Sequence, residues 1–215
     1  GDDASERYVR NKNKMCEEIG VLSETILLPN DVTQEEVRDV IEELNSDDKV
    51  DGILFDLGLS SPQIDNKERG FTFMVDAPLD MRMDQTKKLD AETIVNTYSI
   101  EELTNIFFIY GEEKMSKVIA KKIVSERLNK QIKTTKELVK IIESAVGAKY
   151  FNKNHPERQI FQAIRIEVNG ELDVLKDVLP DAINLLNKGG RLSVITFHSL
   201  EDRIVKQIFK KESEV

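Results

Sequence analysis

The chain has 215 residues, of which 40% are hydrophobic and 33% charged, and its formal net charge is −9. This composition predicts a globular, cytoplasmic protein that is long enough to bury a core. No apolar run approaches the ~18 residues that span a bilayer, and we see no secretory leader, so we expect no membrane association. The single cysteine, Cys16, excludes an internal disulfide, and with only two histidines we expect no bound metal.

The first fifty residues predict a helix, a strand and a second helix. The pattern favours a helix over 5–19, a short strand over 23–28 and a helix over 33–46 that begins with a capping box at Thr33. An apolar run over 50–56 follows, of the kind that forms a strand buried on both faces of a parallel sheet. This alternation of helices and strands indicates an α/β domain with parallel strands.

The end of the strand over 50–56 carries a group of polar residues, Asp56-Leu57-Gly58-Leu59-Ser60-Ser61-Pro62-Gln63. In open α/β sheets, ligands bind beyond the carboxyl ends of the strands, so these residues suggest a binding site. Asp, Gly, Ser and Pro are also common turn residues, so an ordinary loop explains the same octapeptide. On these residues alone both interpretations stay open.

The middle of the chain no longer shows the alternating helix and strand pattern. Residues 64–90 are irregular, whereas 91–148 carry apolar residues at the three- and four-residue spacing of helices, which predicts helices over 100–110, 112–128 and 135–146. Between 114 and 165 there are 13 Lys or Arg, four Glu and no Asp, a local net charge of +9. Such a block is typical of a phosphate-contacting surface, although a lysine-rich solvated helix face has the same composition. We predict an inserted, RNA-binding helical subdomain over 64–167.

The α/β pattern resumes after this insertion. Helical patterns over 159–168 and 170–187 lead to a strand over 191–197 and a last helix over 199–210. The fold class that we predict is α/β, a truncated Rossmann-like parallel sheet with an inserted all-helical subdomain. Residues 1–63 and 168–215 would form the Rossmann-like domain.

Six motifs in order resemble one family of enzymes. They are Asp56–Gln63, Arg69-Gly70-Phe71-Thr72-Phe73, Pro78-Leu79-Asp80-Met81-Arg82-Met83-Asp84, Tyr110-Gly111-Glu112-Glu113, Phe161-Gln162-Ala163-Ile164-Arg165-Ile166-Glu167-Val168-Asn169, and Phe197-His198-Ser199-Leu200-Glu201-Asp202-Arg203. Over about residues 50 to 211 the chain resembles the MraW, or RsmH, family of ribosomal RNA small-subunit methyltransferases. The resemblance implies a class I methyltransferase-like fold, S-adenosylmethionine as cofactor and methylation of a cytidine N4 in small-subunit ribosomal RNA.

The resemblance also assigns roles at the strand end. It implies that Asp56 and Gln63 contact S-adenosylmethionine. Cytosine N4 is a poor nucleophile, so its methylation needs precise placement and acceptors for the amino hydrogens. Ser60, Ser61 and Pro62 suit that task as catalytic residues, because a proline-fixed turn presents hydroxyls and a carbonyl rigidly to a flipped base.

Further candidates lie along the rest of the chain. The residues that would face substrate or RNA are Asp80, Arg82, Arg158, Arg165 and His198. Asp80, Arg82 and Asp84 could form an ion-pair cluster at the pocket or a structural network that closes the loop. His198 could line the pocket or serve only at the entry to the last helix. Arg165 lies four residues before Asn169 on one helix face. The resemblance implies a structural or RNA-facing role for both rather than catalysis.

The first fifty residues resemble a second family. Tyr8-Val9-Arg10-Asn11-Lys12 and the segments that follow are similar to the catalytic domain of the methylenetetrahydrofolate dehydrogenase/cyclohydrolase (FolD) family, in which Lys12 would be catalytic. The sequence has no Gly-x-Gly, so the glycine-rich cofactor loop is missing. We therefore expect a chimera joined near 50–54, with impaired cofactor binding; a catalytically inert scaffold is the alternative. An open sheet edge would favour a homodimer.

Overall fold

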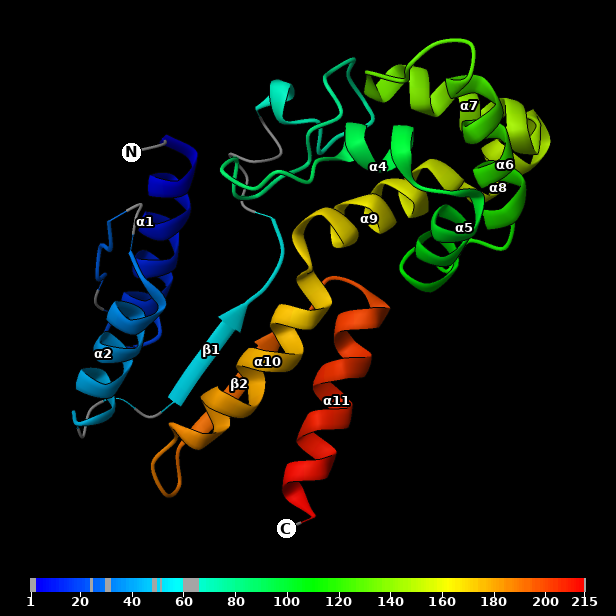
Figure 1. Cartoon of the computed structure of the whole chain (residues 1–215). Helices are drawn as coiled ribbons and strands as arrows, with labels where there is room; N and C mark the ends of the chain where they lie inside the picture. Colours follow the sequence, from blue (N-terminus) through cyan, green and yellow to red (C-terminus); the bar gives the residue numbers. More distant parts are fainter. Residues whose placement is uncertain are drawn as a thin grey trace. The chain divides into compact units, whose positions relative to one another are not determined.

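The computed structural model describes the chain except for residues 1–2, 24, 30–31, 48–49, 51, 60–65 and 215, and the side chains of 3–5, 8 and 34. The chain divides into two compact units, Gly1–Ser60 with Leu172–Val215, and Ser61–Glu171. Figure 1 shows both. We call them the α/β unit and the helical unit and describe each by itself.

The α/β unit contains a parallel pair of strands with helices around it. Its elements are α1 (Asp3–Glu18), α2 (Gln34–Asn45), β1 (Gly52–Asp56), α10 (Glu171–Asn184), β2 (Arg191–Ile195) and α11 (Ser199–Ser213). β1 and β2 pair in parallel from Gly52↔Arg191 to Asp56↔Ile195. Half-buried and exposed residues alternate along both strands, so each strand presents one face to a core. The unit therefore has the truncated Rossmann-like architecture that the sequence predicts.

One face of this sheet packs against a small core. Phe55 and Val194 lie against Leu175, Leu179 and Val205, which come from α10 and α11. On the opposite face Leu54 is 59% exposed. Parallel sheets are normally covered on both faces, so the described part of the unit leaves one sheet face less covered than is usual.

The strand predicted over 23–28 is wrong for the residues that the structure describes there, because 23 and 25–28 have no strand pairing. The described sheet holds only β1 and β2. An extended segment gains ladder hydrogen bonds only beside another strand. Here the Ser23 hydroxyl donates to Asn13 Oδ1 and Asn13 Nδ2 donates to the Thr25 hydroxyl, which holds the start of the segment against α1. Leu27 stays 89% exposed.

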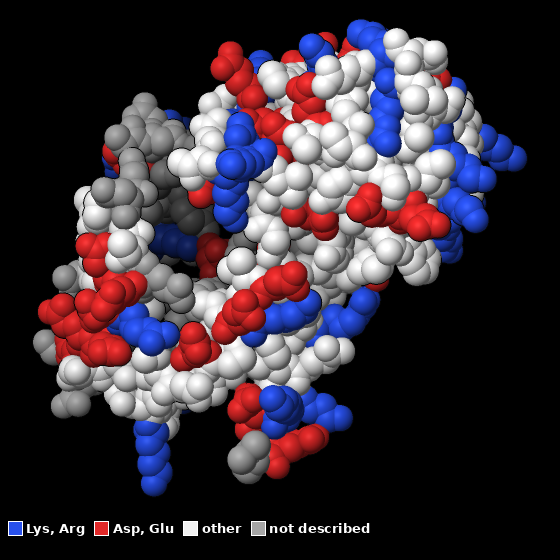
Figure 2. Space-filling model, in the orientation of Figure 1, with Lys and Arg blue, Asp and Glu red and all other residues white. Residues whose placement is uncertain are grey.

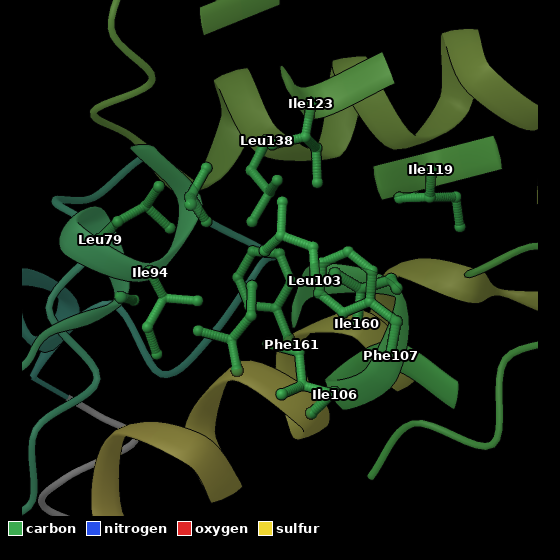
Figure 3. Packing of buried hydrophobic residues seen from close by; sticks show 14 of the residues in the cluster. Leu79, Ile94, Leu103, Ile106, Phe107, Ile119, Ile123, Leu138, Ile160 and Phe161 are labelled. Carbon is green, nitrogen blue, oxygen red and sulfur yellow. The ribbon is translucent and has the colours of Figure 1, made fainter. Parts of the chain in front are cut away.

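The helical unit consists of short helices. They are η1 (Lys67–Arg69), α4 (Ala91–Thr97), α5 (Ile100–Ile109), α6 (Ser116–Arg127), α7 (Thr135–Val146), α8 (Ala148–Asn154) and α9 (Pro156–Asn169). Side chains from α4 to α7 and α9 converge on one hydrophobic core, in which Phe107, Leu103 and Ile164 are completely buried (Figure 3). No helix in the described ranges is long and apolar enough to cross a membrane.

Capping residues explain where these helices begin. The side chains of Asp90, Ser99 and Thr134 each accept a hydrogen bond from a backbone N–H three residues later. Such caps satisfy the donors that a helix leaves unpaired at its N-terminus. The helix predicted over 135–146 is confirmed with the same bounds. The seven-residue helix α8 was not predicted, because its apolar residues are too few to establish a periodicity.

Candidate functional site

The carboxyl ends of β1 and β2 lie at the same edge of the sheet, because the two strands are parallel. The Leu57 N–H donates to the Ile195 carbonyl at 3.3 Å, which extends the pairing one residue past β1. Gly58 follows with φ = 96°, and a Cβ there would lie 3.1 Å from the Phe197 ring. The chain segments that leave the two strands therefore converge, and this edge of the sheet is our candidate active site.

Asp56 is the predicted site residue that the structure describes most fully at this edge. Its Oδ2 lies 2.8 Å from the Nζ of Lys12, on helix α1. The two side chains are 26% and 47% exposed, so the ion pair is solvated and adds little to stability. Sequence reasoning missed this contact, because it joins residues 44 positions apart. The carboxylate is held at the strand end by a cation of the same unit.

The residues predicted to be catalytic, Ser60, Ser61 and Pro62, lie outside the described residues, as does Gln63. Their roles stay predictions. In the sequence they lie between Leu59, the last described residue of the α/β unit before the gap, and Asn66, the first described residue of the helical unit.

His198 follows β2 and is the N-cap of α11. Its Nδ1 accepts a hydrogen bond from the Glu201 N–H at 3.4 Å, and the Glu201 carboxylate accepts from the Phe197 and His198 N–H groups at 2.8 and 3.3 Å. This reciprocal arrangement is a capping box. The geometry is that of a helix-entry residue, and a role of His198 toward substrate stays a prediction.

Asp80 and Arg82 form a two-point ion pair in the helical unit. The distances are 2.9 Å from Nε to Oδ1 and 2.8 Å from Nη2 to Oδ2. The hydrogen bonds from Arg82 are the main reason that the pKa of Asp80 lies below its ordinary value. Arg82 also donates through Nη1 to the carbonyls of Gln85 and Lys87. Asp84, by contrast, accepts from the backbone and hydroxyl of Thr86.

Asn169 fixes the same loop to helix α9. Its Oδ1 accepts from the Met83 N–H at 2.7 Å, and its Nδ2 donates to the Met81 carbonyl at 2.8 Å. Met81 is buried and has φ = 59°, a left-handed conformation that costs a non-glycine residue energy. Arg69 donates to the Arg82 and Met83 carbonyls from the other side. These hydrogen bonds close the loop over 80–84 and tie it to α9, and a role of Asp80 or Arg82 toward substrate stays a prediction.

Arg158 and Arg165 have different surroundings. Arg165 donates through Nε and Nη2 to the two carboxylate oxygens of Glu171, at 2.8 and 2.9 Å, and only 19% of its side chain is exposed. Arg158 is exposed near the start of α9. The guanidinium group of Arg165 is thus paired with a carboxylate within the helical unit, whereas the side chain of Arg158 is exposed to solvent.

The exposed cations of the helical unit form a basic surface. Figure 2 shows Lys and Arg side chains spread over the outer edge of this unit. Within residues 114–165, the exposed cations that form no ion pair in the described chain are Lys114, Lys117, Lys121, Lys133, Lys140, Lys149, Lys153 and Arg158, and we call these the basic surface. Cations without partners can exchange counterions for phosphates, so this surface can bind a polyanion.

The fold and the strand-end carboxylate define a class of protein, a truncated Rossmann-like α/β protein with a helical insertion. Within that class the chain belongs to the MraW methylase family, whose model matches residues 14–215. The chain is similar to proteins named ribosomal RNA small subunit methyltransferase H. It is 57% identical over 169 residues to the one from Streptococcus pyogenes serotype M4 and 55% identical over 175 residues to the one from Clostridium botulinum. The relative from Streptococcus dysgalactiae subsp. equisimilis is 57% identical over 169 residues.

The extent of these matches shows which part of the first fifty residues belongs to the family match. The matches cover 78%, 81% and 78% of this chain, and 54%, 56% and 54% of the respective relatives. The chain therefore spans about half the length of the relatives. We expected the resemblance to begin near residue 50, but the family match begins at residue 14 and includes 14–49. The resemblance of these residues to the folate enzymes finds no support in these comparisons.

Proposed function

We propose that the chain takes part in S-adenosylmethionine-dependent methylation of the N4 of a cytidine in small-subunit ribosomal RNA. The observation that carries the proposal is the Asp56 carboxylate at the shared carboxyl edge of β1 and β2, in a chain of a methylase family. The names of the three relatives agree with this substrate. Cytoplasmic ribosomal subunits would be the partner.

The residues at the strand end fit the cofactor in part. Asp56 offers a carboxylate, which suits a ligand that carries hydroxyl donors and positive charge. Its pairing with Lys12 is solvated, so an incoming donor can replace the ammonium group. The sequence has no Gly-x-Gly to approach the methionine part of the cofactor closely. When bound, S-adenosylmethionine supplies an activated methyl group; we place Asp56 and Gln63 among the residues that hold it.

We assign the handling of the target base to Ser60, Ser61 and Pro62. Hydroxyl and carbonyl oxygens that accept the two amino hydrogens of cytosine would orient the N4 lone pair toward the methyl group, and the proton that the nitrogen loses after methylation would pass to water. Proline fixes φ of its own residue, so these acceptors are held in one arrangement before the base arrives. Asp80, Arg82, Arg158, Arg165 and His198 are assigned to the surroundings of the substrate, with Arg158 the most accessible.

Methyl transfer tests the proposed activity. With tritiated S-adenosylmethionine and undermethylated small ribosomal subunits, we expect label in N4-methylcytidine after nuclease digestion. A Ser60→Ala/Ser61→Ala variant should lose ~10²-fold or more in rate, the scale of a missing set of positioned hydrogen-bond partners. Wild-type cofactor affinity in that variant shows that the cofactor site is intact. Label in another nucleotide, or none where the cofactor binds, contradicts the proposal.

The basic surface should bind the RNA through phosphates. In a Lys117→Glu/Lys121→Glu variant of helix α6 we expect weaker binding of ribosomal RNA. The slope of log affinity against log salt should fall by about one unit for each phosphate that the variant no longer neutralises. Filter binding at several salt concentrations measures that slope.

A matched control for the basic surface lies in the same unit. Lys67→Glu/Lys88→Glu makes the same change in net charge at exposed positions outside 114–165. We expect a smaller change of slope in this control. An unchanged salt slope in the Lys117/Lys121 variant, or equal changes in both variants, would remove the basic segment from the RNA surface.

A catalytically inert scaffold, a chimera of two Rossmann-like proteins, is the second candidate. Two observations favour this alternative. Lys12 forms an ion pair with Asp56, the carboxylate of the candidate site, and the sequence has no Gly-x-Gly. Residues 1–13, which include Lys12, lie outside the family match. On this alternative the chain keeps its packing and binds no cofactor. The predicted homodimer stays a prediction; the exposed Leu54 face of the sheet supports it.

A further inference from the structure

A cavity of about 300 Å³ opens on the helical unit, and none of the basic surface residues lines it. Its lining comes from the C-caps of α4 and α5, one face of α5, and α9: Tyr98, Glu102, Asn105, Ile106, Ile109, Tyr110 and Glu167. The lining thus combines two tyrosine rings, two carboxylates and an amide over an apolar floor. The candidate active site uses none of these residues.

The polar groups of the cavity are held in place. The Tyr98 hydroxyl donates to Glu167 Oε1 at 2.8 Å, and the Glu102 carboxylate accepts from the Ser99 N–H at 2.7 Å. Burial, followed by the hydrogen bond to Glu167, raises the pKa of Tyr98 far above its ordinary value, so Tyr98 stays a neutral donor. Each hydrogen bond engages one carboxylate oxygen, and the carboxylates are fixed before any ligand arrives.

The charge of the cavity selects its ligand. No Lys or Arg is among the described residues that line it, so the two glutamates make it locally anionic. A nucleic-acid backbone would bring phosphates toward these carboxylates and be repelled. A guanidinium group, in contrast, pairs with a carboxylate through two parallel hydrogen bonds and stacks on aromatic rings.

The rim of the cavity has the composition of a protein interface. Ile109, which lines the cavity, and Phe108, which precedes it on α5, are 52% and 63% exposed. Large apolar side chains beside an arginine pocket are typical of the central residues of protein interfaces. From these features we infer that the cavity is a docking site for an arginine side chain of a protein partner, flanked by apolar residues. The inference does not depend on methyl transfer by this chain.

The experiment is an NMR titration of the full chain with the blocked peptide acetyl-Leu-Arg-Leu-amide. We expect chemical-shift changes at Tyr98, Asn105 and Ile109. The same peptide with citrulline, which keeps the shape of arginine and lacks its charge, should bind at least fivefold more weakly. Equal binding of the two peptides would overturn the inference.

Variants of the two glutamates locate the binding. Glu102→Gln keeps a capping box, and Glu167→Gln still offers an oxygen to Tyr98, so the double variant should fold. We expect it to bind the arginine peptide at least fivefold more weakly, whereas Glu101→Gln/Glu143→Gln, with the same charge change at exposed positions, should match wild type. Equal loss in both double variants, or tighter binding of cytidine or guanosine monophosphate at the same resonances, would overturn the inference.

Discussion

Phe107→Ala should lower the free energy of unfolding of the helical unit by about 3–5 kcal/mol, the usual cost of truncating a buried phenylalanine. Phe107 is completely buried at the centre of the helical core, where side chains from α4, α5, α6 and α9 meet (Figure 3). Removing its ring leaves a cavity that close-packed neighbours fill only in part. Hydrogen exchange of the buried amides of α5 and α9 measures the change.

The neighbouring phenylalanine is a matched control. Phe108 lies on the same helix but is 63% exposed, so Phe108→Ala should change the unfolding free energy by less than about 1 kcal/mol. Similar losses in the two variants, or a change below about 1 kcal/mol in Phe107→Ala, would contradict the described core.

Asn169→Leu should destabilise the loop over 80–84 by about 2–5 kcal/mol. Leucine has nearly the same shape as asparagine but cannot pair with the Met83 N–H or the Met81 carbonyl. Each buried group left without a partner costs about 1–3 kcal/mol. The loss should also release the left-handed backbone of Met81, which these hydrogen bonds hold. Hydrogen exchange of the Met83 amide reports the change directly.

Asn152→Leu is the comparison for this variant, because it makes the same substitution at an exposed position, on α8. In the Asn152→Leu variant we expect the Met83 amide to show the same hydrogen-exchange rate as in the wild-type chain. If the Met83 amide is as well protected from hydrogen exchange in Asn169→Leu as in the wild-type chain, Asn169 does not hold the loop.

Much of the fold could be predicted from local patterns. The capping box at Thr33, the helix over 135–146 and the strands at 50–56 and 191–197 follow from caps and apolar spacing, which act over a few residues. The strand over 23–28 was wrong because a strand needs a partner, and partners are set by the tertiary fold. An apolar run such as Ile26-Leu27-Leu28 does not show whether another strand lies beside it.

The candidate site was predictable in position but not in its contacts. The rule that ligands bind at the carboxyl ends of parallel strands placed Asp56 at the edge where β1 and β2 end. The ion pair with Lys12 joins segments that are distant in sequence, so no spacing could indicate it. Asn169 left a weaker signal, as a polar residue in the last turn of a helix whose neighbours are apolar.

The first fifty residues show how little a short motif says about the family of a segment. Their short likeness to the folate enzymes and the missing Gly-x-Gly suggested a foreign segment, whereas the family match includes all but the first 13 residues. The residues that determine packing in α2 and β1, such as Ile41 and Ile53, are apolar types that many α/β folds share. Local likeness in such a segment therefore does not identify its family.

Calorimetric titration with S-adenosylmethionine tests the central claim most directly, namely that the Asp56 edge of the sheet is a cofactor site. The account predicts micromolar binding, about 8 kcal/mol of binding free energy. Asp56→Asn should weaken it about tenfold or more, because a charge-assisted hydrogen bond is removed. Lys12→Met should leave the affinity unchanged or higher, and Asp39→Asn, an exposed acid on α2, should match wild type. No binding by the wild-type chain, or equal affinity of wild type and Asp56→Asn, would contradict the claim.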